Sequence, residues 1–207
     1  MTLQEKIDKL VEFEQGNFHD VNNEGGQASC QRDDRTFYIM RSSQFSAWSE
    51  EMIDSYMDDL LQAWMNGRNL LAEKYAWMES ETAPKKFEEI KHLLTPPTPA
   101  GEEMIEKITE MQVDWMEEYA AKYPYVAAGN RYIRAKDAPP WATSFETYTR
   151  GELHTYSERT LALYLAHSLK LKEEGRNMVL EVMETTMKQY GFADLDEAER
   201  LTKEHRS

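Results

Sequence analysis

Apolar residues recur at three- and four-residue spacing along most of the chain, which is the pattern of helices that bury one face. Residues 2–20 begin with Thr2-x-x-Glu5, a capping box, and residues 101–122 carry a second apolar face of the same kind. These two faces consist of Ile7, Leu10, Val11 and Phe18, and of Met104, Ile108, Met111, Trp115 and Tyr119. Since no segment alternates apolar and polar residues between turn signals, the sequence predicts an all-α protein.

A longer helix is predicted next in each half, and each ends at a glycine. In the first half its apolar positions run through Phe45, Trp48, Met52, Tyr56, Leu60 and Trp64. Gly67 and Gly175 can adopt the left-handed backbone that ends a helix, and Asn69 and Asn177 stand where the next helix needs an N-cap. Third helices are therefore predicted over residues 69–79 and 177–190, and shorter closing helices over residues 84–93 and 194–204.

The two halves resemble one another, because residues 36–78 align with residues 144–186 without a gap. The paired positions include Phe37 with Phe145, Ser49-Glu50 with Ser157-Glu158, Tyr56 with Tyr164, Leu61 with Leu169, Gly67-Arg68-Asn69 with Gly175-Arg176-Asn177, and Glu73 with Glu181. We interpret this as a tandem duplication of a three- to four-helix unit that packs as a pseudo-twofold helical bundle. The prediction is one compact domain over residues 1–207, with repeat 1 at about 1–94, a proline-rich linker at 95–100 and repeat 2 at about 101–205. Ser49 and Ser157 fall on the buried faces, so we expect the two long helices to cross there.

One apolar face carries four ionisable side chains. At 100° per residue Glu146, Arg150, His154 and Glu158 fall at about 20°, 60°, 100° and 140°, within the arc expected to be buried. The equivalent positions of the first half hold Tyr38, Ser42, Ser46 and Glu50. Because buried charges are costly unless they are paired, the stripe either forms a paired ladder or internal network, or lines a water-accessible cleft.

In the cleft interpretation, these residues bind and act on a ligand. Arg150 would hold a carboxylate or phosphate, with Glu146 beside it, because a guanidinium suits either group. His154 would move protons together with Glu158 or Glu50.

Further ligand contacts are expected from the first of two long loops, residues 21–35 and 123–143. Asn22, Asn23 and Glu24 precede paired glycines that permit close approach to a ligand, although a simple turn would also explain the segment. Trp48 and Tyr156 complete the expected substrate-binding residues.

Composition narrows the class of protein. The net charge of -14 would repel nucleic acid and anionic membranes, and 41% apolar with 30% charged residues is too polar for a membrane span. The first residues lack the pattern of a secretory signal, so we expect a cytoplasmic protein. Cys30 is the one cysteine, which excludes an internal disulfide, and Glu89-x-x-His92 lacks the second pair of a di-iron site. No metal and no cofactor are expected.

Four segments together resemble a bacterial family catalogued as a domain of unknown function, number 4125. They are Val21-Asn-Asn-Glu-Gly-Gly-x-Ala-Ser-Cys-Gln31, Ser43-Gln-Phe-x-Ala-Trp-Ser-Glu50, Gly67-Arg-Asn-Leu-Leu-x-Glu-Lys-Tyr75 and Thr143-Ser-Phe-Glu-Thr-Tyr-x-Arg-Gly-Glu-Leu-x-Thr-Tyr-Ser-Glu158. The resemblance covers nearly the whole chain. It implies that the Asn-Asn-Glu-Gly-Gly loop and the stripe belong to the family pattern, with a small residue expected in relatives where this chain has His154.

Two functions fit the sequence. The first is binding of a small polar or anionic molecule in a central cleft, with metal-independent acid/base chemistry left open. The second is a non-catalytic helical adaptor that binds a partner protein through Met- and Trp-rich surfaces, and homodimer formation is also left open. A polar pocket that contains Arg150 would favour the first, and an exposed contiguous apolar patch the second.

Overall fold

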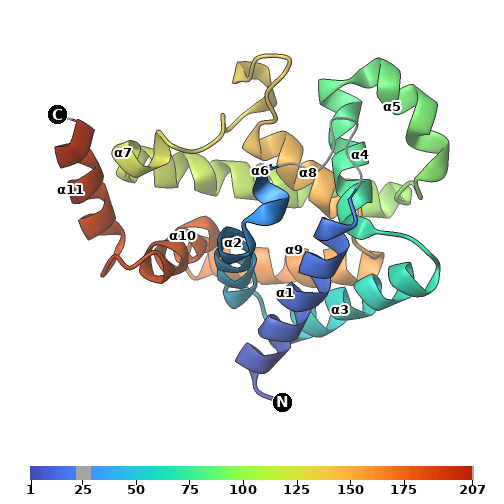
Figure 1. The fold of residues 1–207 in the computed structure, drawn as a ribbon, viewed down its shortest axis with the longest axis horizontal. Coiled ribbons are helices and arrows are strands. Elements are labelled where there is room, and N and C mark those ends of the chain that lie inside the picture. The colour runs from blue at the N-terminus through green and yellow to red at the C-terminus, as the bar shows by residue number, and fades with distance from the viewer. Residues whose placement is uncertain (22–28, 207) are drawn as a thin grey trace.

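The computed structural model describes residues 1–21 and 29–206, and this part of the chain forms eleven α-helices, three short 3-10 helices and no strand (Figure 1). The all-α prediction is confirmed. The first half contains α1 (Leu3–His19), η1 (Ser29–Arg32), α2 (Asp34–Ser46), α3 (Glu50–Met65), α4 (Leu70–Thr82), α5 (Pro84–Ile90) and η2 (Lys91–Leu93). The second contains α6 (Pro99–Lys122), α7 (Pro124–Ala127), η3 (Ala135–Asp137), α8 (Phe145–Leu153), α9 (Glu158–Glu173), α10 (Met178–Gln189) and α11 (Leu195–Arg206).

Several helix ends lie where the sequence predicts them. Thr2 caps α1 in a complete capping box, in which its backbone N–H donates to the Glu5 carboxylate at 2.7 Å. Gly67 and Gly175 have φ of 69° and 67°, and Asn69 and Asn177 cap the helices that follow. Short polar side chains and glycine thus set these ends.

The predicted long helix of each half is wrong, because the chain breaks it into two. Ser49 and Ser157 have extended backbone and cap α3 and α9, where their hydroxyls accept from the N–H groups of Met52 and Thr160. The serines therefore do not lie in the middle of a helix at a crossing point. Serine is a weak helix former in the interior of a helix. At the start of a helix its hydroxyl accepts from a free N–H group of the first turn, which favours serine as an N-cap.

Both halves contribute to one cluster of buried apolar side chains, with α3 packed against α9. At this contact the hydroxyls of Ser55 and Thr160 lie 2.8 Å apart. Four aromatic rings fill the centre: Trp48, Tyr56, Tyr156 and Tyr164.

Helix α8 packs closely on α4, which matters for the site below. A Cβ at Gly151 would lie 2.6 Å from Met78 Cγ and 3.0 Å from the Lys74 carbonyl oxygen, so only glycine permits this approach. The contact places the side chains of α4 beside those of α8.

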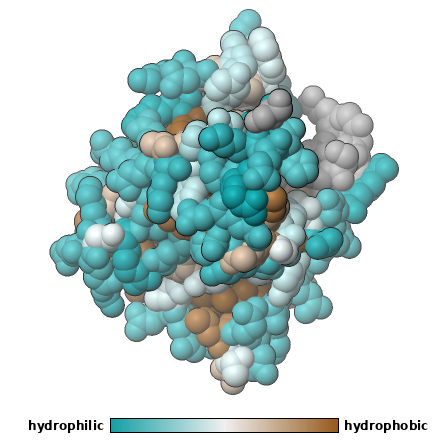
Figure 2. Space-filling view, turned by 90° about the vertical axis from the view of Figure 1, so that its left-hand side faces the viewer, coloured by the Kyte–Doolittle hydropathy of each residue, from teal (hydrophilic) through white to brown (hydrophobic). Residues whose placement is uncertain are grey.

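The surface in Figure 2 is mostly hydrophilic and is interrupted by small apolar areas. Within residues 1–21 and 29–206, no helix combines the length and the apolar character needed to cross a bilayer.

Candidate functional site

Arg150 lies in a network of carboxylates rather than in an open cleft. Its guanidinium contacts Glu81 at 2.6 Å, Glu106 at 2.8 Å and Glu146 at 3.2 Å, from α4, α6 and α8. Burial alone would raise the pKa of Glu146, but hydrogen bonds from the Ala135 N–H and from Arg150 lower it. Three protein carboxylates already pair with Arg150, so this face of α8 forms a partly exposed network of ion pairs, which corresponds to the paired alternative left open by the sequence.

The other members of the predicted stripe lie apart. His154 ends α8 and stacks on Trp77 with ring centroids 4.4 Å apart, while its Nε2 lies 3.5 Å from Glu102. Glu158 begins α9 and accepts a hydrogen bond from Thr98, and Glu50 pairs with Lys6 at 2.8 Å. The four-residue spacing does not continue across Ser157, because α8 has ended there.

Trp48 and Tyr156 meet in the aromatic centre, with ring centroids 5.9 Å apart. Tyr156 also lines the cavity described below, whereas Trp48 is not one of its lining residues. The predicted loop contacts Asn22, Asn23 and Glu24 fall outside the described residues.

A cavity of about 610 Å³ lies among α2, α4, α6, α8 and α10. Much of its wall is apolar and includes Phe18, Phe37, Leu71, Met116, Phe145 and Val182. Its size is typical of sites for small organic molecules, which commonly combine apolar walls with a few polar groups.

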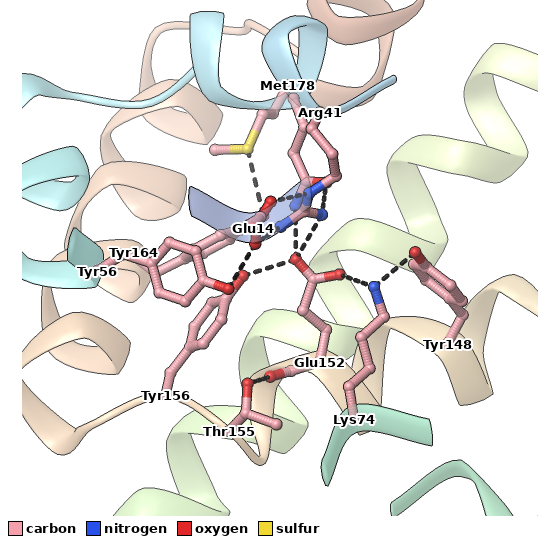
Figure 3. A network of polar contacts seen from close by, with 11 residues as sticks. Glu14, Arg41, Tyr56, Lys74, Tyr148, Glu152, Thr155, Tyr156, Tyr164 and Met178 are labelled. Carbon is pink, nitrogen blue, oxygen red and sulfur yellow. Dashed lines mark hydrogen bonds and ion pairs between the residues drawn. The ribbon is translucent and has the colours of Figure 1, made fainter. Parts of the chain in front are cut away.

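Glu152 lines this cavity and takes part in the network of polar contacts in Figure 3. Its carboxylate lies 2.7 Å from Lys74 Nζ and 2.9 Å from Arg41 Nη1, and the Tyr156 hydroxyl donates to it at 2.7 Å. Gln44 donates a further hydrogen bond at 3.0 Å. These contacts satisfy a buried charge that would otherwise be costly.

Arg41 joins Glu152 to a second buried carboxylate, Glu14 of α1. Arg41 Nε and Nη2 each lie 2.6 Å from a Glu14 oxygen, and the Tyr56 hydroxyl donates to Glu14 at 2.7 Å. Glu14 is 0% exposed. A bidentate arginine and a phenol together satisfy a carboxylate that has no access to water.

Neighbouring charges keep Glu152 and Lys74 ionised in spite of their burial. Burial works to raise the pKa of Glu152, but Arg41 and Lys74 hold it well below its usual value. Burial works to lower the pKa of Lys74, but Glu152 raises it. Burial and the adjacent carboxylates raise the pKa values of Tyr56 and Tyr156, so both phenols are neutral near neutral pH.

Lys74 also connects the network to Tyr148 of α8. Its Nζ donates to the Tyr148 hydroxyl at 2.5 Å, and this phenol lines the cavity. On the same ring lies the guanidinium of Arg131, 5.3 Å from the centroid. Arg131 is exposed and, in the part of the chain that the structure describes, forms no ion pair. Among the described residues, the lining therefore holds Arg41, Lys74 and Arg131 with the carboxylate of Glu152, in a protein of net charge -14. Glu14, outside the lining, also pairs with Arg41.

Sequence reasoning missed this group, although a signal for it exists. Glu14 lies on the same helical face as Leu10, Val11 and Phe18, and Lys74 on that of Leu70 and Met78. An ionisable residue within an apolar stripe is expensive to bury, so each such residue indicates a buried partner.

Within residues 1–21 and 29–206, no three His, Cys, Asp or Glu side chains group as metal ligands would. The predicted lone pair Glu89 and His92 is exposed on α5 and η2.

Comparison with known proteins gives one match. No curated protein and no solved structure matches the chain. The sequence profile of a family described as a protein of unknown function, DUF4125, matches residues 4–200, and the chain therefore belongs to this family.

Proposed function

We propose that the protein binds a small organic anion in the cavity among α2, α4, α6, α8 and α10. The observation that carries the proposal is an unbalanced positive charge among the described residues of this lining. Glu14 and Glu152 pair with Arg41 and Lys74. This leaves the charge of Arg131 without an ion pair at the cavity. A chain of net charge -14 would give such a cavity a negative lining if its charges were distributed at random. A local reversal of charge suits an anionic ligand.

Two donors favour recognition of an oxygen atom. The Tyr148 hydroxyl accepts from the Lys74 ammonium, which leaves the phenol proton to donate to an occupant of the cavity. A hydroxyl that accepts from a cation becomes a stronger donor, because neighbouring hydrogen bonds polarise one another. Arg131 adds a planar guanidinium at the exposed side of the same ring.

The cavity also supports the proposal that the chain is a pseudo-twofold duplication forming one domain. In the alignment of the halves Gln44 corresponds to Glu152, and these two side chains hydrogen-bond to one another at 3.0 Å. Equivalent cross-contacts recur in the aromatic centre, where ring centroids of Trp48 and Tyr164 lie 5.3 Å apart and those of Tyr56 and Tyr156 lie 4.8 Å apart. Reciprocal contacts of this kind are the property of a twofold axis, and the axis would pass through the cavity.

We propose binding rather than proton transfer by the residues predicted from sequence. Glu50, Glu158 and His154 do not line this cavity and are engaged with Lys6, Thr98 and Trp77. Tyr148 and Arg131 line the cavity and offer donors to an occupant.

Fluorescence titration with anilinonaphthalene sulfonate, an apolar anion, tests the proposal, together with native mass spectrometry of the purified protein. Met40, which is half-exposed and lines the cavity, is replaced by Trp to narrow the cavity. Met65 is exposed outside the cavity and receives the same substitution as a control. Arg131→Gln should weaken binding about tenfold, as expected for loss of one charge-assisted hydrogen bond. Arg159→Gln removes the same charge elsewhere and should leave binding unchanged. Equal affinities in all four variants would contradict the proposal.

A helical adaptor is the second candidate, favoured by one observation. Trp64 and Met65 at the end of α3 are 63% and 69% exposed, and Leu61 is exposed beside them one turn earlier. Replacing Trp64 and Met65 by Ser would abolish binding of a partner protein in the adaptor function and would not affect anion binding in the first.

A further inference from the structure

The two sides of the cavity differ at two pairs of positions that the duplication would make equivalent. Lys74 of α4 corresponds to Val182 of α10, and Tyr148 of α8 corresponds to Met40 of α2. All four side chains line the cavity. Each pair thus places a polar group on one side and an apolar group on the other.

The helix packing groups these differences into two separate surfaces. Helix α4 packs on α8, so Lys74, Tyr148 and Glu152 lie together, as Figure 3 shows. Helix α10 packs on α2, and its cavity-lining side chains include Val182 and Met183. Arg41 and Gln44 of α2 also line the cavity, but both bind Glu152 and so belong to the polar group. The cavity therefore has a polar side around Lys74, Tyr148 and Glu152, and an apolar side formed by Met40 of α2 with Val182 and Met183 of α10.

We propose that the occupant is an amphiphilic acid that binds in one orientation. Its acidic group lies at Tyr148, Lys74 and Arg131, and its aliphatic or aromatic body lies along Met40 and Val182. The inference rests on the proposed function and adds to it the ligand class and the direction of binding.

Both parts of such a ligand find matching groups. An acidic oxygen receives donors from Tyr148 and Arg131, and the positive charge that Arg131 supplies is not neutralised by an ion pair within the described residues. A hydrocarbon body would leave water for the apolar side, and each buried methylene strengthens binding about fourfold. The reverse orientation would place a charge against the apolar side chains of Val182 and Met40, which is costly.

Calorimetric titration of the full chain with hexanoate, octanoate and decanoate tests the inference. Native mass spectrometry first establishes that the protein sample is free of any co-purified molecule. We expect affinity to rise about fourfold per added methylene. Decyltrimethylammonium, with the same chain and the opposite charge, should bind at least tenfold more weakly than decanoate.

Exchange of equivalent residues then tests the orientation. Tyr148→Phe keeps the ring beneath Lys74 and removes its hydroxyl. It should weaken the binding of all three carboxylates by a similar factor of about ten, while the dependence of affinity on chain length stays unchanged. Met40→Tyr introduces a polar group on the apolar side and should reduce that dependence while hexanoate binds as before. Thermal melting establishes that each variant is folded, and Met65→Tyr is the matched surface control.

The outcomes separate this inference from the proposed function. Two outcomes would contradict the proposal of an amphiphilic acid bound in one orientation and leave the proposed anion binding intact. One is that the affinity of the carboxylates does not depend on chain length. The other is that decyltrimethylammonium binds as tightly as decanoate. If neither the carboxylates nor anilinonaphthalene sulfonate binds, the proposed function itself fails.

Discussion

The buried charges show how individual residues determine whether this interior is stable. Arg41 contacts Glu14 and Glu152, which are from different halves of the chain, and all three side chains are buried. A buried ion pair adds little net stability compared with apolar residues of the same shape, but the loss of one partner leaves a charge without compensation. The network is therefore a point of high sensitivity to single substitutions.

Arg41→Met should lower the free energy of unfolding by about 3–5 kcal/mol, because two carboxylates would lose their shared cation. Urea denaturation measures the change. Arg176→Met is the control, since Arg176 holds Glu181 in a similar two-point contact at 2.7 and 2.9 Å but is half-exposed, and such pairs contribute little. Equal losses in both variants would show that burial of the network is not the cause.

The lowered pKa of Glu152 predicts how the free energy of unfolding depends on pH. Its pKa in the folded protein is well below that of a glutamate in an unfolded chain, about 4.3. The stabilisation that ionised Glu152 contributes is complete above about pH 4.3. It is lost as the pH falls towards the pKa of Glu152 in the folded protein, because the unfolded chain takes up the proton first. In Glu152→Gln, the unfolding free energy should fall less steeply between about pH 5 and 3. Urea denaturation at a series of pH values gives the slope, and an unchanged slope would contradict the assignment.

At the scale of the elements, close packing of α8 on α4 brings Tyr148 and Glu152 to Lys74. Gly151 permits this approach, whereas Gly16 in α1 has no atom within 4 Å of the place of a Cβ. Gly151→Ala should lower the free energy of unfolding by about 1–3 kcal/mol through overpacking. Gly16→Ala should raise it by about 0.5–1 kcal/mol through helix propensity. Thermal melting compares the two, and a stabilised Gly151→Ala protein would contradict the close contact.

Helix ends were more predictable from sequence than helix continuity. Thr2, Gly67 and Asn69 act through local backbone geometry, which a short segment determines by itself. The break at Ser49 was missed because helical spacing continues across it from Phe45 to Trp64, and a cap and an interior serine look alike in sequence. The error changed the predicted orientation of the next helix.

The predicted site residues of α8 lie on a different face from the one that lines the cavity. Arg150 contacts Glu81 and Glu106, and Glu146 contacts Arg150. By contrast, Tyr148, Glu152 and Tyr156 line the cavity. A wheel drawn through α8 and α9 as one helix cannot distinguish these faces. The partners Glu14 and Lys74 lie far away in sequence, so their contact with α8 depends on tertiary packing.

At the scale of the whole molecule, the packing predicts that neither half folds alone. Trp48 and Tyr56 pack against Tyr156 and Tyr164 of the other half. Each half by itself would expose its rings, and the first half would leave Arg41 without Glu152. Exposed aromatic area of this extent and an unpaired buried charge both oppose folding of a half.

Residues 1–94 and 95–207, produced separately, should each lack cooperative thermal unfolding and should regain it together when mixed. Circular dichroism measures helix content and melting, and fluorescence of the buried Trp48 reports formation of the shared centre. The second segment retains Thr98, whose hydroxyl caps α6, so a missing cap would not account for failure to fold. Two halves that each melt cooperatively would mean that the shared interior is not needed for folding. In that case the cavity would lie between independent domains, and its opening could change with their separation.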